Sequence, residues 1–167
     1  MPWLKNSRGT VTCPVSQPDL VPTLLDLLGQ PVPSHLHGRS WLPYLKGEGA
    51  FPEQDVFIEW NGPNSGFGDS VGRATLQEAG MATASVEQAI ASITDPVRTI
   101  TSPQGWKLNC SPLGEHELYN LEQDPGETRN LIREPSARAL VHDLYHRTLV
   151  WQRRVDDPVD LTNCRFP

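Results

Sequence analysis

The first third of the chain carries the hydrophobic pattern of a short helix. Apolar residues recur there at intervals of three and four positions, which predicts a helix over residues 18–28. Those that share the predicted apolar face are Leu20, Leu24, Leu27 and Leu28. Asp19 is interpreted as a capping residue of the first turn. A second short helix is expected over residues 41–45, with Ser40 as its N-cap.

The remainder of the chain contains four segments rich in β-branched and aromatic residues, a composition typical of strands. Turn residues join the second to the third through residues 102–105, and the third to the fourth through residues 111–114. Such short connections predict an antiparallel sheet of about four strands. The expected strands are residues 55–60, 97–101, 106–110 and 116–121.

A long amphipathic helix is expected from Pro135 to about Val155, because apolar residues recur there at helical spacing. The residues of its apolar stripe are Ala137, Leu140, Val141, Leu144, Thr148, Trp151 and Val155. Charged residues occupy other positions and are expected to face away from the stripe. The helix should therefore pack on the sheet, and the chain is predicted to be of the α+β class.

The segment between the first two expected strands lacks a clear period. Residues 61–80 are rich in Gly, Ser and Asn and contain few apolar anchors, which predicts a long loop. A short helix over residues 85–93, capped by Ser85, is expected to follow, and Pro96 fits its end. Residues 61–95 are thus interpreted as a loop or insertion.

Charge and hydropathy argue against some classes of function. The 167 residues include 14 basic and 20 acidic side chains, and no basic cluster exceeds the Arg153–Arg154 pair, which is not the footprint of a nucleic-acid-binding protein. No apolar run approaches the ~20 residues of a membrane span. The first residues lack the pattern of a signal peptide, and the compartment stays open. The three cysteines, Cys13, Cys110 and Cys164, are expected to be free thiols.

Three segments, in this order and spacing, resemble the C-terminal third of the sulfatase family, which has the alkaline-phosphatase-like α/β fold. The first, over residues 15–29 and 37–45, is similar to the family's D-x-x-P-T-L-L-D-L-x-G helix and its G-x-S-L-x-P-x-L continuation. The second, over residues 97–108, resembles the R-x-I-x-T-x-x-x-K-L hairpin. The third, over residues 117–131, matches the E-L-Y-D-L-x-x-D-P-x-E-x-x-N-L segment and is the most specific.

The resemblance also implies how the chain is organised. Residues 1–47 correspond to the last helix and connection of the large α/β domain. Residues 48–157 correspond to the C-terminal subdomain, in which the loop or insertion at residues 61–95 has no obvious counterpart. Residues 158–167 form a tail. The natural N-terminus is expected to lie before residue 1.

Sulfatases hydrolyse sulfate esters, and the family places its chemistry upstream of this region. The resemblance implies a formylglycine nucleophile, made from Cys or Ser in a C-x-P-x-R-type motif, beside a calcium or magnesium ion held by Asp and Asn. These motifs do not occur in the 167 residues, so no catalytic residue and no metal ligand is assigned in this chain. We expect the chain alone to be inactive. A sulfate-ester small molecule or glycan would bind through the family's N-terminal domain.

Some short patterns imitate functional motifs. Cys110-Ser111-Pro112 has the C-x-P spacing, but Gly114 stands where the modification motif needs Arg, and we interpret the segment as a hairpin turn. Three pairs lack a third metal ligand at a suitable spacing and are interpreted as helix caps, helix ends or helix surface. These pairs are Asp19 with Asp26, Asp156 with Asp157, and His142 with His146.

Five residues are candidates for the rim of a substrate site in a full-length homologue. His37 and Arg39 precede a helix cap, and a surface or interdomain position is their alternative. Trp60 and Asn61 stand where a strand gives way to the long loop, and a variable surface insertion is their alternative. Arg98 leads a strand, where an ion pair is the alternative to a contact with sulfate.

Two other functions stay open. Phosphonate and phosphate monoester hydrolases share this architecture and have similar C-terminal segments, and what separates them from sulfatases lies upstream. The chain is alternatively a non-catalytic interaction domain, in which the apolar face of the helix over residues 18–28 would need a partner. Solution behaviour distinguishes the two cases, because a genuine domain unfolds cooperatively whereas a severed fragment aggregates through such a face.

Overall fold

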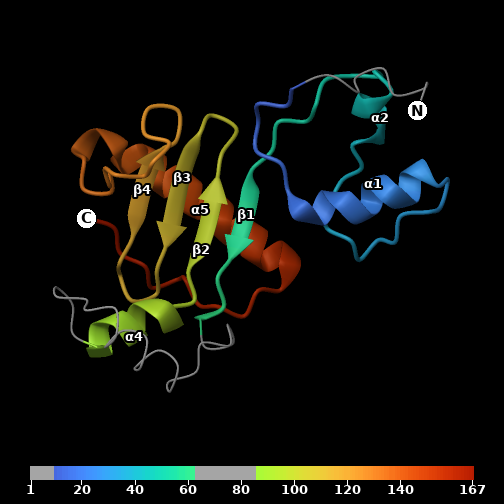
Figure 1. Cartoon of the computed structure of the whole chain (residues 1–167). Coiled ribbons are helices and arrows are strands. Elements are labelled where there is room, and N and C mark those ends of the chain that lie inside the picture. The colour runs from blue at the N-terminus through green and yellow to red at the C-terminus, as the bar shows by residue number, and fades with distance from the viewer. Residues whose placement is uncertain (1–9, 63–85) are drawn as a thin grey trace. The chain divides into compact units, whose positions relative to one another are not determined.

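The computed structural model describes residues 10–62 and 86–167 of the chain (Figure 1). The chain divides into two compact units, Met1–Val56 with Thr101–Gly105, and Phe57–Ile100 with Trp106–Pro167. Among the described residues, no helix is both long enough and apolar enough to cross a membrane. The predicted division after residue 47 refers to the parts of a longer protein and stays a prediction.

The first unit contains both of the helices predicted in this part of the chain. A 3-10 turn over Gln17–Asp19 leads into α1 (Leu20–Leu27), and α2 (Leu42–Leu45) follows a loop connection. The Ser40 hydroxyl accepts a hydrogen bond from the Leu42 N–H at 3.1 Å. The N-cap position itself is Trp41, so Ser40 lies one residue earlier than the cap and still satisfies the first N–H of the helix.

Asp19 does not cap α1, and that prediction was wrong. Its carboxylate accepts hydrogen bonds from the Arg39 N–H at 2.8 Å, the Trp41 indole N–H at 3.2 Å and the Gln54 amide at 2.6 Å. The side chain is buried, and no cap hydrogen bond forms at the start of the helix. A buried carboxylate needs several donors, and the later segment supplies more of them than the first turn of a helix does.

The predicted antiparallel sheet is confirmed, and most of its residues belong to the second unit. Its strands lie in the order β1-β2-β3-β4 (Figure 1). β3 pairs with β4 in antiparallel register, with Leu108 opposite Leu118. The Gly105 N–H donates to the Ser102 carbonyl at 3.0 Å and closes the predicted turn between β2 and β3. The strand bounds are β1 (Val56–Glu59), β2 (Arg98–Thr101), β3 (Trp106–Cys110) and β4 (Glu117–Asn120).

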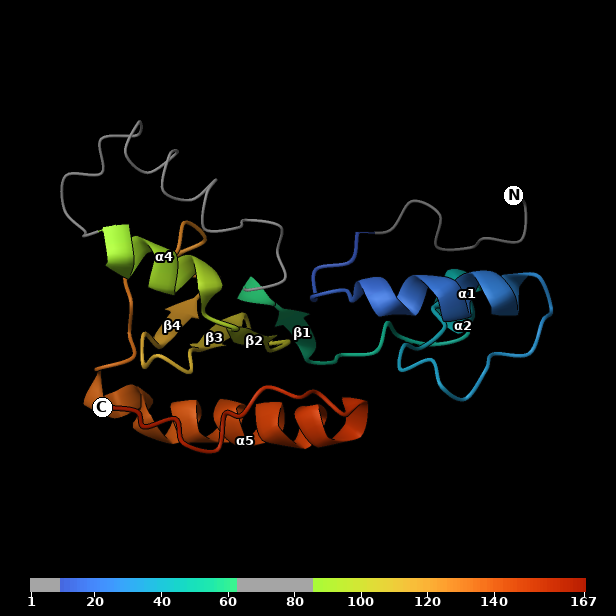
Figure 2. The same cartoon turned by 90° about the horizontal axis from the view of Figure 1, so that it is seen from below.

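The predicted C-terminal helix runs along one face of this sheet (Figure 2). A 3-10 turn over Pro135–Ala137 leads into α5 (Arg138–Val155). The predicted stripe is confirmed, because five of its seven residues are buried and the other two are half-buried. Helix and sheet enclose a core of Ile100, Leu108, Cys110, Leu118, Ile132, Ala137, Val141, Leu144 and Leu161.

The two ends of the segment between β1 and β2 meet. The short helix expected there is confirmed as α4 (Val86–Thr94), which lies at the end of the strands on the side of the sheet away from α5 (Figures 1 and 2). The Trp60 indole donates to the Ile93 carbonyl at 2.9 Å. A Cβ at Gly62 would lie 2.2 Å from the Thr94 carbonyl oxygen, so a larger residue does not fit. The long loop predicted over residues 61–80 and the cap at Ser85 fall mostly outside the described residues.

Candidate functional site

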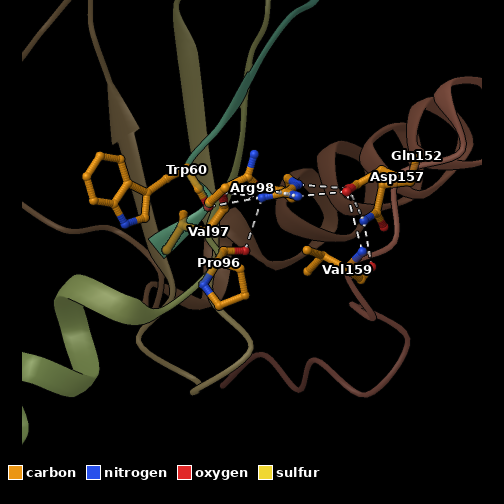
Figure 3. A network of polar contacts seen from close by, with 8 residues as sticks. Trp60, Pro96, Val97, Arg98, Gln152, Asp157 and Val159 are labelled. Carbon is orange, nitrogen blue, oxygen red and sulfur yellow. Dashed lines mark hydrogen bonds and ion pairs between the residues drawn. The ribbon is translucent and has the colours of Figure 1, made fainter. Parts of the chain in front are cut away.

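Arg98 opens β2, and its side chain reaches Asp157 just beyond the end of α5 (Figure 3). Its Nε and Nη2 donate to the two carboxylate oxygens of Asp157 at 2.8 and 2.7 Å. Both side chains are only 1% exposed. The ion pair considered for Arg98 is therefore confirmed, and its bidentate geometry is that of a strong, directional pair.

The other donors of the Arg98 guanidinium are also engaged within the second unit. Nη1 donates to the Trp60 carbonyl at 3.1 Å, and Nη2 also donates to Asn61 Oδ1 at 2.9 Å. The carbonyl oxygens of Val97 and Pro96 lie 3.3 and 3.5 Å from Nη1. A sulfate group could reach this guanidinium only by displacing such partners. The arrangement suits a residue that positions the end of β1.

Asp157 is also held by α5. The Gln152 amide donates to Asp157 Oδ2 at 2.6 Å and to the Val159 carbonyl at 2.8 Å. Burial pushes the pKa of Asp157 upward, but hydrogen bonds from Arg98 and Gln152 outweigh it, and the pKa lies below its ordinary value. Sequence reasoning missed Gln152, although its position four residues after Thr148 places it on the buried stripe.

The structure brings together three of the five predicted rim residues. Trp60 and Asn61 both accept hydrogen bonds from Arg98, and both leave part of their side chains exposed. His37 and Arg39 lie in the first unit, and both are exposed. A substrate contact by any of these residues stays a prediction.

Residues 117–131, the segment with the most specific resemblance, end in a turn after β4. In this turn, side-chain oxygens accept hydrogen bonds from backbone N–H groups. Asp124 accepts hydrogen bonds from the N–H groups of Thr128 and Arg129 at 2.8 and 2.9 Å. The Arg129 N–H is the main cause of a pKa of Asp124 below its ordinary value. Asn120 Oδ1 accepts from the next N–H groups of the turn, those of residues 122 and 123, at 3.1 Å. The D-P-x-E pattern therefore specifies backbone structure.

The Asn130 side chain connects the end of this turn to β4 through hydrogen bonds to the backbone. Its Oδ1 accepts from the N–H groups of Leu118 and Ile132 at 3.0 Å, and its Nδ2 donates to the His116 carbonyl at 3.1 Å. We expect Asn130→Ala to lower the free energy of unfolding by about 1–3 kcal/mol, because it leaves these backbone groups without partners. Urea denaturation measures the change. Asn163→Ala, at an exposed position in the tail, is the control and should change stability by less than about 0.5 kcal/mol.

A second polar cluster lies at the turn between β3 and β4. The Ser111 hydroxyl donates to the Asp95 carboxylate, and the Ser111 N–H donates to His116 Nδ1 at 3.1 Å. All three residues are buried, and the ring of Phe166 packs on His116 with centroids 4.4 Å apart. Because the serine hydroxyl bonds to the aspartate and not to the histidine, the cluster does not have the geometry of a Ser-His-Asp triad. The cluster connects Asp95, the residue that follows α4, to the turn between β3 and β4.

His116 should make stability depend on pH. Burial lowers its pKa from the ordinary value of 6.5, although Asp95 and the Arg165 backbone oppose the shift. The unfolded chain therefore binds a proton more readily than the folded one. The contribution of His116 is complete above pH 6.5 and is lost as the pH falls below it.

Urea unfolding at about pH 8 and about pH 5.5 measures this dependence. We expect His116→Asn to reduce the difference in stability between the two conditions. His146→Asn, which replaces an exposed histidine of α5, should leave the difference unchanged. An unaltered difference in His116→Asn would contradict the assignment.

The described residues do not fit the nucleophile or the metal that the resemblance implies for a whole sulfatase. Cys110 ends β3 in the core, and burial raises the pKa of its thiol far above the ordinary range. The Gly114 N–H donates to the Ser111 carbonyl at 3.0 Å, which confirms the predicted turn. Within residues 10–62 and 86–167, no group of three or more His, Cys, Asp or Glu side chains is placed to hold a metal ion.

In comparisons with known proteins, the chain is similar to sulfatases both in sequence and in structure. No protein-family model matches the chain. The Delta 4,5-hexuronate-2-O-sulfatase of Bacteroides thetaiotaomicron is 26% identical over 152 residues, which cover 89% of this chain and 26% of that relative. A solved 2-O GAG sulfatase is also 26% identical, with a TM-score of 0.57 over 89% of this chain and 26% of that structure. The chain thus spans about a quarter of the length of these relatives.

The fold is shared with another kind of hydrolase. A phosphonate monoester hydrolase from Silicibacter pomeroyi is 23% identical, with a TM-score of 0.51 over 81% of this chain and 24% of that structure. At this identity the similarity shows the fold alone. These neighbours have the alkaline-phosphatase-like fold, and the predicted fold class is confirmed.

Proposed function

Because the chain is similar in sequence and in fold to the C-terminal part of sulfatases, we propose that it serves within a sulfatase-like hydrolase that cleaves sulfuric esters. The observation that carries the proposal is that a sequence relative and a solved structure, both sulfatases, each match 89% of the chain. The calcium or magnesium ion and the formylglycine would belong to the rest of such a protein. The 167 residues alone would then be inactive.

We also propose a sulfated sugar as the substrate class. The relatives with 26% identity are named as a hexuronate 2-O-sulfatase and a 2-O GAG sulfatase. Trp60 and Asn61 are neighbours in the chain and both are partly exposed, and an aromatic and an amide side chain are residue types that suit a sugar ring. The fold itself leaves the phosphonate alternative possible, since it is shared with a phosphonate monoester hydrolase.

The test begins with the natural product of the gene. Its intact mass and the reading frame before residue 1 should reveal a longer protein with a C-x-P-x-R or S-x-P-x-R motif. That protein and the purified 167 residues are then assayed on a sulfated disaccharide, an aryl sulfate and a phosphonate monoester, with calcium or magnesium. We expect metal-dependent release of sulfate by the longer protein alone.

Each other outcome contradicts a stated part of the proposal. Turnover by the purified 167 residues would refute their inactivity. Turnover of the phosphonate alone would replace the sulfatase assignment with its alternative. A natural product of 18.6 kDa without the motif upstream would remove the enzyme function from this chain.

A further inference from the structure

Residues 158–167, predicted as a tail, are packed into the second unit. Leu161 is 0% exposed within the core, and the Tyr145 hydroxyl donates to its carbonyl. Beyond it, the Cys164 N–H donates to the Leu161 carbonyl at 3.0 Å, and the side chains of Cys164 and Phe166 pack against the core. Leu161 therefore anchors residues 162–167, which we call the strap.

Phe166 of the strap lies against the ring of His116, with centroids 4.4 Å apart. Phe166 also meets two rings of α5, those of Tyr145 and His142, with centroids 5.0 and 6.3 Å away. His116 is only 5% exposed in this arrangement. The strap thus closes over a histidine, and contacts between rings hold it there.

The contacts of His116 require the neutral form of its ring. The Ser111 N–H donates to Nδ1, so this nitrogen is an acceptor, and the proton of the neutral ring lies on Nε2. A second proton would place an N–H on Nδ1, opposite the Ser111 N–H. The hydrogen bond between them would be lost, and a buried polar group without a partner is unfavourable. A proton on His116 is therefore incompatible with the closed strap.

Two carboxylates act on the His116 ring. Those of Asp95, after α4, and Glu115, the preceding residue, favour a proton on the ring, as does the Arg165 backbone. Burial opposes the proton more strongly and lowers the pKa below its ordinary value of 6.5. Opening the strap brings the ring into water and removes this burial. The open state therefore binds a proton more readily than the closed state.

The other titratable and charged groups beside the strap do not oppose this change. Tyr145 and Cys164 stay uncharged near neutral pH, because burial raises the pKa of both. His142, which also contacts Phe166, is exposed to water. The Arg165 guanidinium donates to the carbonyl oxygens of residues 162 and 164, which belong to the strap itself. His116 is therefore the group whose protonation the closed strap opposes.

We propose that His116 and Phe166 form a latch, which opens the strap when His116 takes up a proton. The strap is the part that moves, because α5 and the sheet are joined by the core, whereas the described contacts of the strap with it are those of Cys164 and Phe166. Leu161 stays buried, so residues 162–167 open while the sheet and α5 keep their contacts. The latch does not depend on the sulfatase chemistry proposed above.

Hydrogen exchange of the 167-residue chain at about pH 7.5 and about pH 5.5 tests the latch. Mass spectrometry of a fragment that contains the strap gives its protection factor, which corrects for the effect of pH on exchange itself. We expect protection to fall severalfold at the lower pH, with about tenfold as the limit for one proton on a group of pKa 6.5. The fall should persist unchanged in low urea, because a local opening exposes little surface.

The two histidines that contact Phe166 provide a matched pair of variants. His116→Asn should abolish the pH dependence of strap protection, because asparagine does not take up a proton in this range. His142→Asn should retain the pH dependence. Phe166→Ala should reduce strap protection at both pH values, since it removes the ring that covers His116. Circular dichroism verifies that each variant remains folded.

Three results would overturn the latch. The first is strap protection that does not change with pH. The second is strap protection that depends on urea as steeply as that of β3, because the strap would then open only when the whole unit unfolds. The third is a pH dependence that folded His116→Asn retains or that His142→Asn abolishes. If His116→Asn does not fold, the wild-type chain and His142→Asn still decide between these outcomes.

Discussion

Replacing Asp157 with alanine is expected to lower the free energy of unfolding by about 3–5 kcal/mol. The substitution leaves the Arg98 guanidinium in a site where it is 1% exposed, without the carboxylate that accepts two of its N–H groups. It also removes an acceptor of the Gln152 amide. Removing one partner of a buried pair costs more than the pair contributes, because the remaining charge stays desolvated. Urea denaturation measures the loss.

A surface ion pair of the same chain provides the control. Lys107 Nζ lies 2.6 Å from Glu127 Oε2, but these side chains are 21 and 34% exposed. We expect Glu127→Ala to cost about 0–1 kcal/mol, and we expect high salt to diminish this cost. The cost of Asp157→Ala should persist in high salt, since solvent ions do not reach a buried pair. Equal costs for the two variants would contradict the assigned burial of the Arg98–Asp157 pair.

Acid should weaken the same pair. The folded-state pKa of Asp157 lies below its ordinary value of 3.8, so the pair contributes fully above that value. Its contribution is lost as the pH falls through the lower, folded-state pKa. Asp157→Ala should therefore flatten the acid limb of the stability curve, which urea unfolding at a series of acidic pH values measures.

The elements of the fold were predictable because their signals are local. The apolar stripe of α5 and the turns that join β2 to β3 and β3 to β4 are determined by residues only a few positions apart in the sequence. The Arg98–Asp157 pair joins residues 59 positions apart. The sequence around Arg98 predicted a strand, and Asp157 before Pro158 predicted the end of a helix. Neither local pattern indicates which distant residue the side chain contacts.

In the candidate site, too, local features were predictable and contacts between distant residues were not. The D-P-x-E segment was identified from its sequence, yet its meaning emerged only from the backbone N–H groups that Asp124 and Asn130 contact. Asp19 had the spacing of a cap, and donors from residues 39–54 decided its position instead. The leucine pattern of α1 predicted an apolar face correctly. It did not reveal that the face opposite would be the one buried within this chain.

Replacing Trp151 with alanine should cost about 3–5 kcal/mol of stability. The Trp151 ring, on α5, stacks on the ring of Phe57, on β1, with centroids 4.7 Å apart and an angle of 3° between the planes. Truncation removes a large buried side chain and leaves a cavity between helix and sheet. We expect faster amide hydrogen exchange in β1, because the strand loses the main aromatic contact described for it, and urea denaturation gives the change in stability.

Two further variants separate support of β1 from the contacts at its end. Trp151→Phe retains a ring against Phe57 and should cost clearly less than Trp151→Ala. Trp60→Ala removes a partly exposed side chain and should also cost less, although it breaks the hydrogen bond to the Ile93 carbonyl. If Trp60→Ala proved the more destabilising of the two alanine variants, the stacked pair would not be what holds β1. Under the expected order, Trp60→Ala leaves β1 held by Trp151, so this variant tests the proposed substrate contact of Trp60 apart from the stability of the strand.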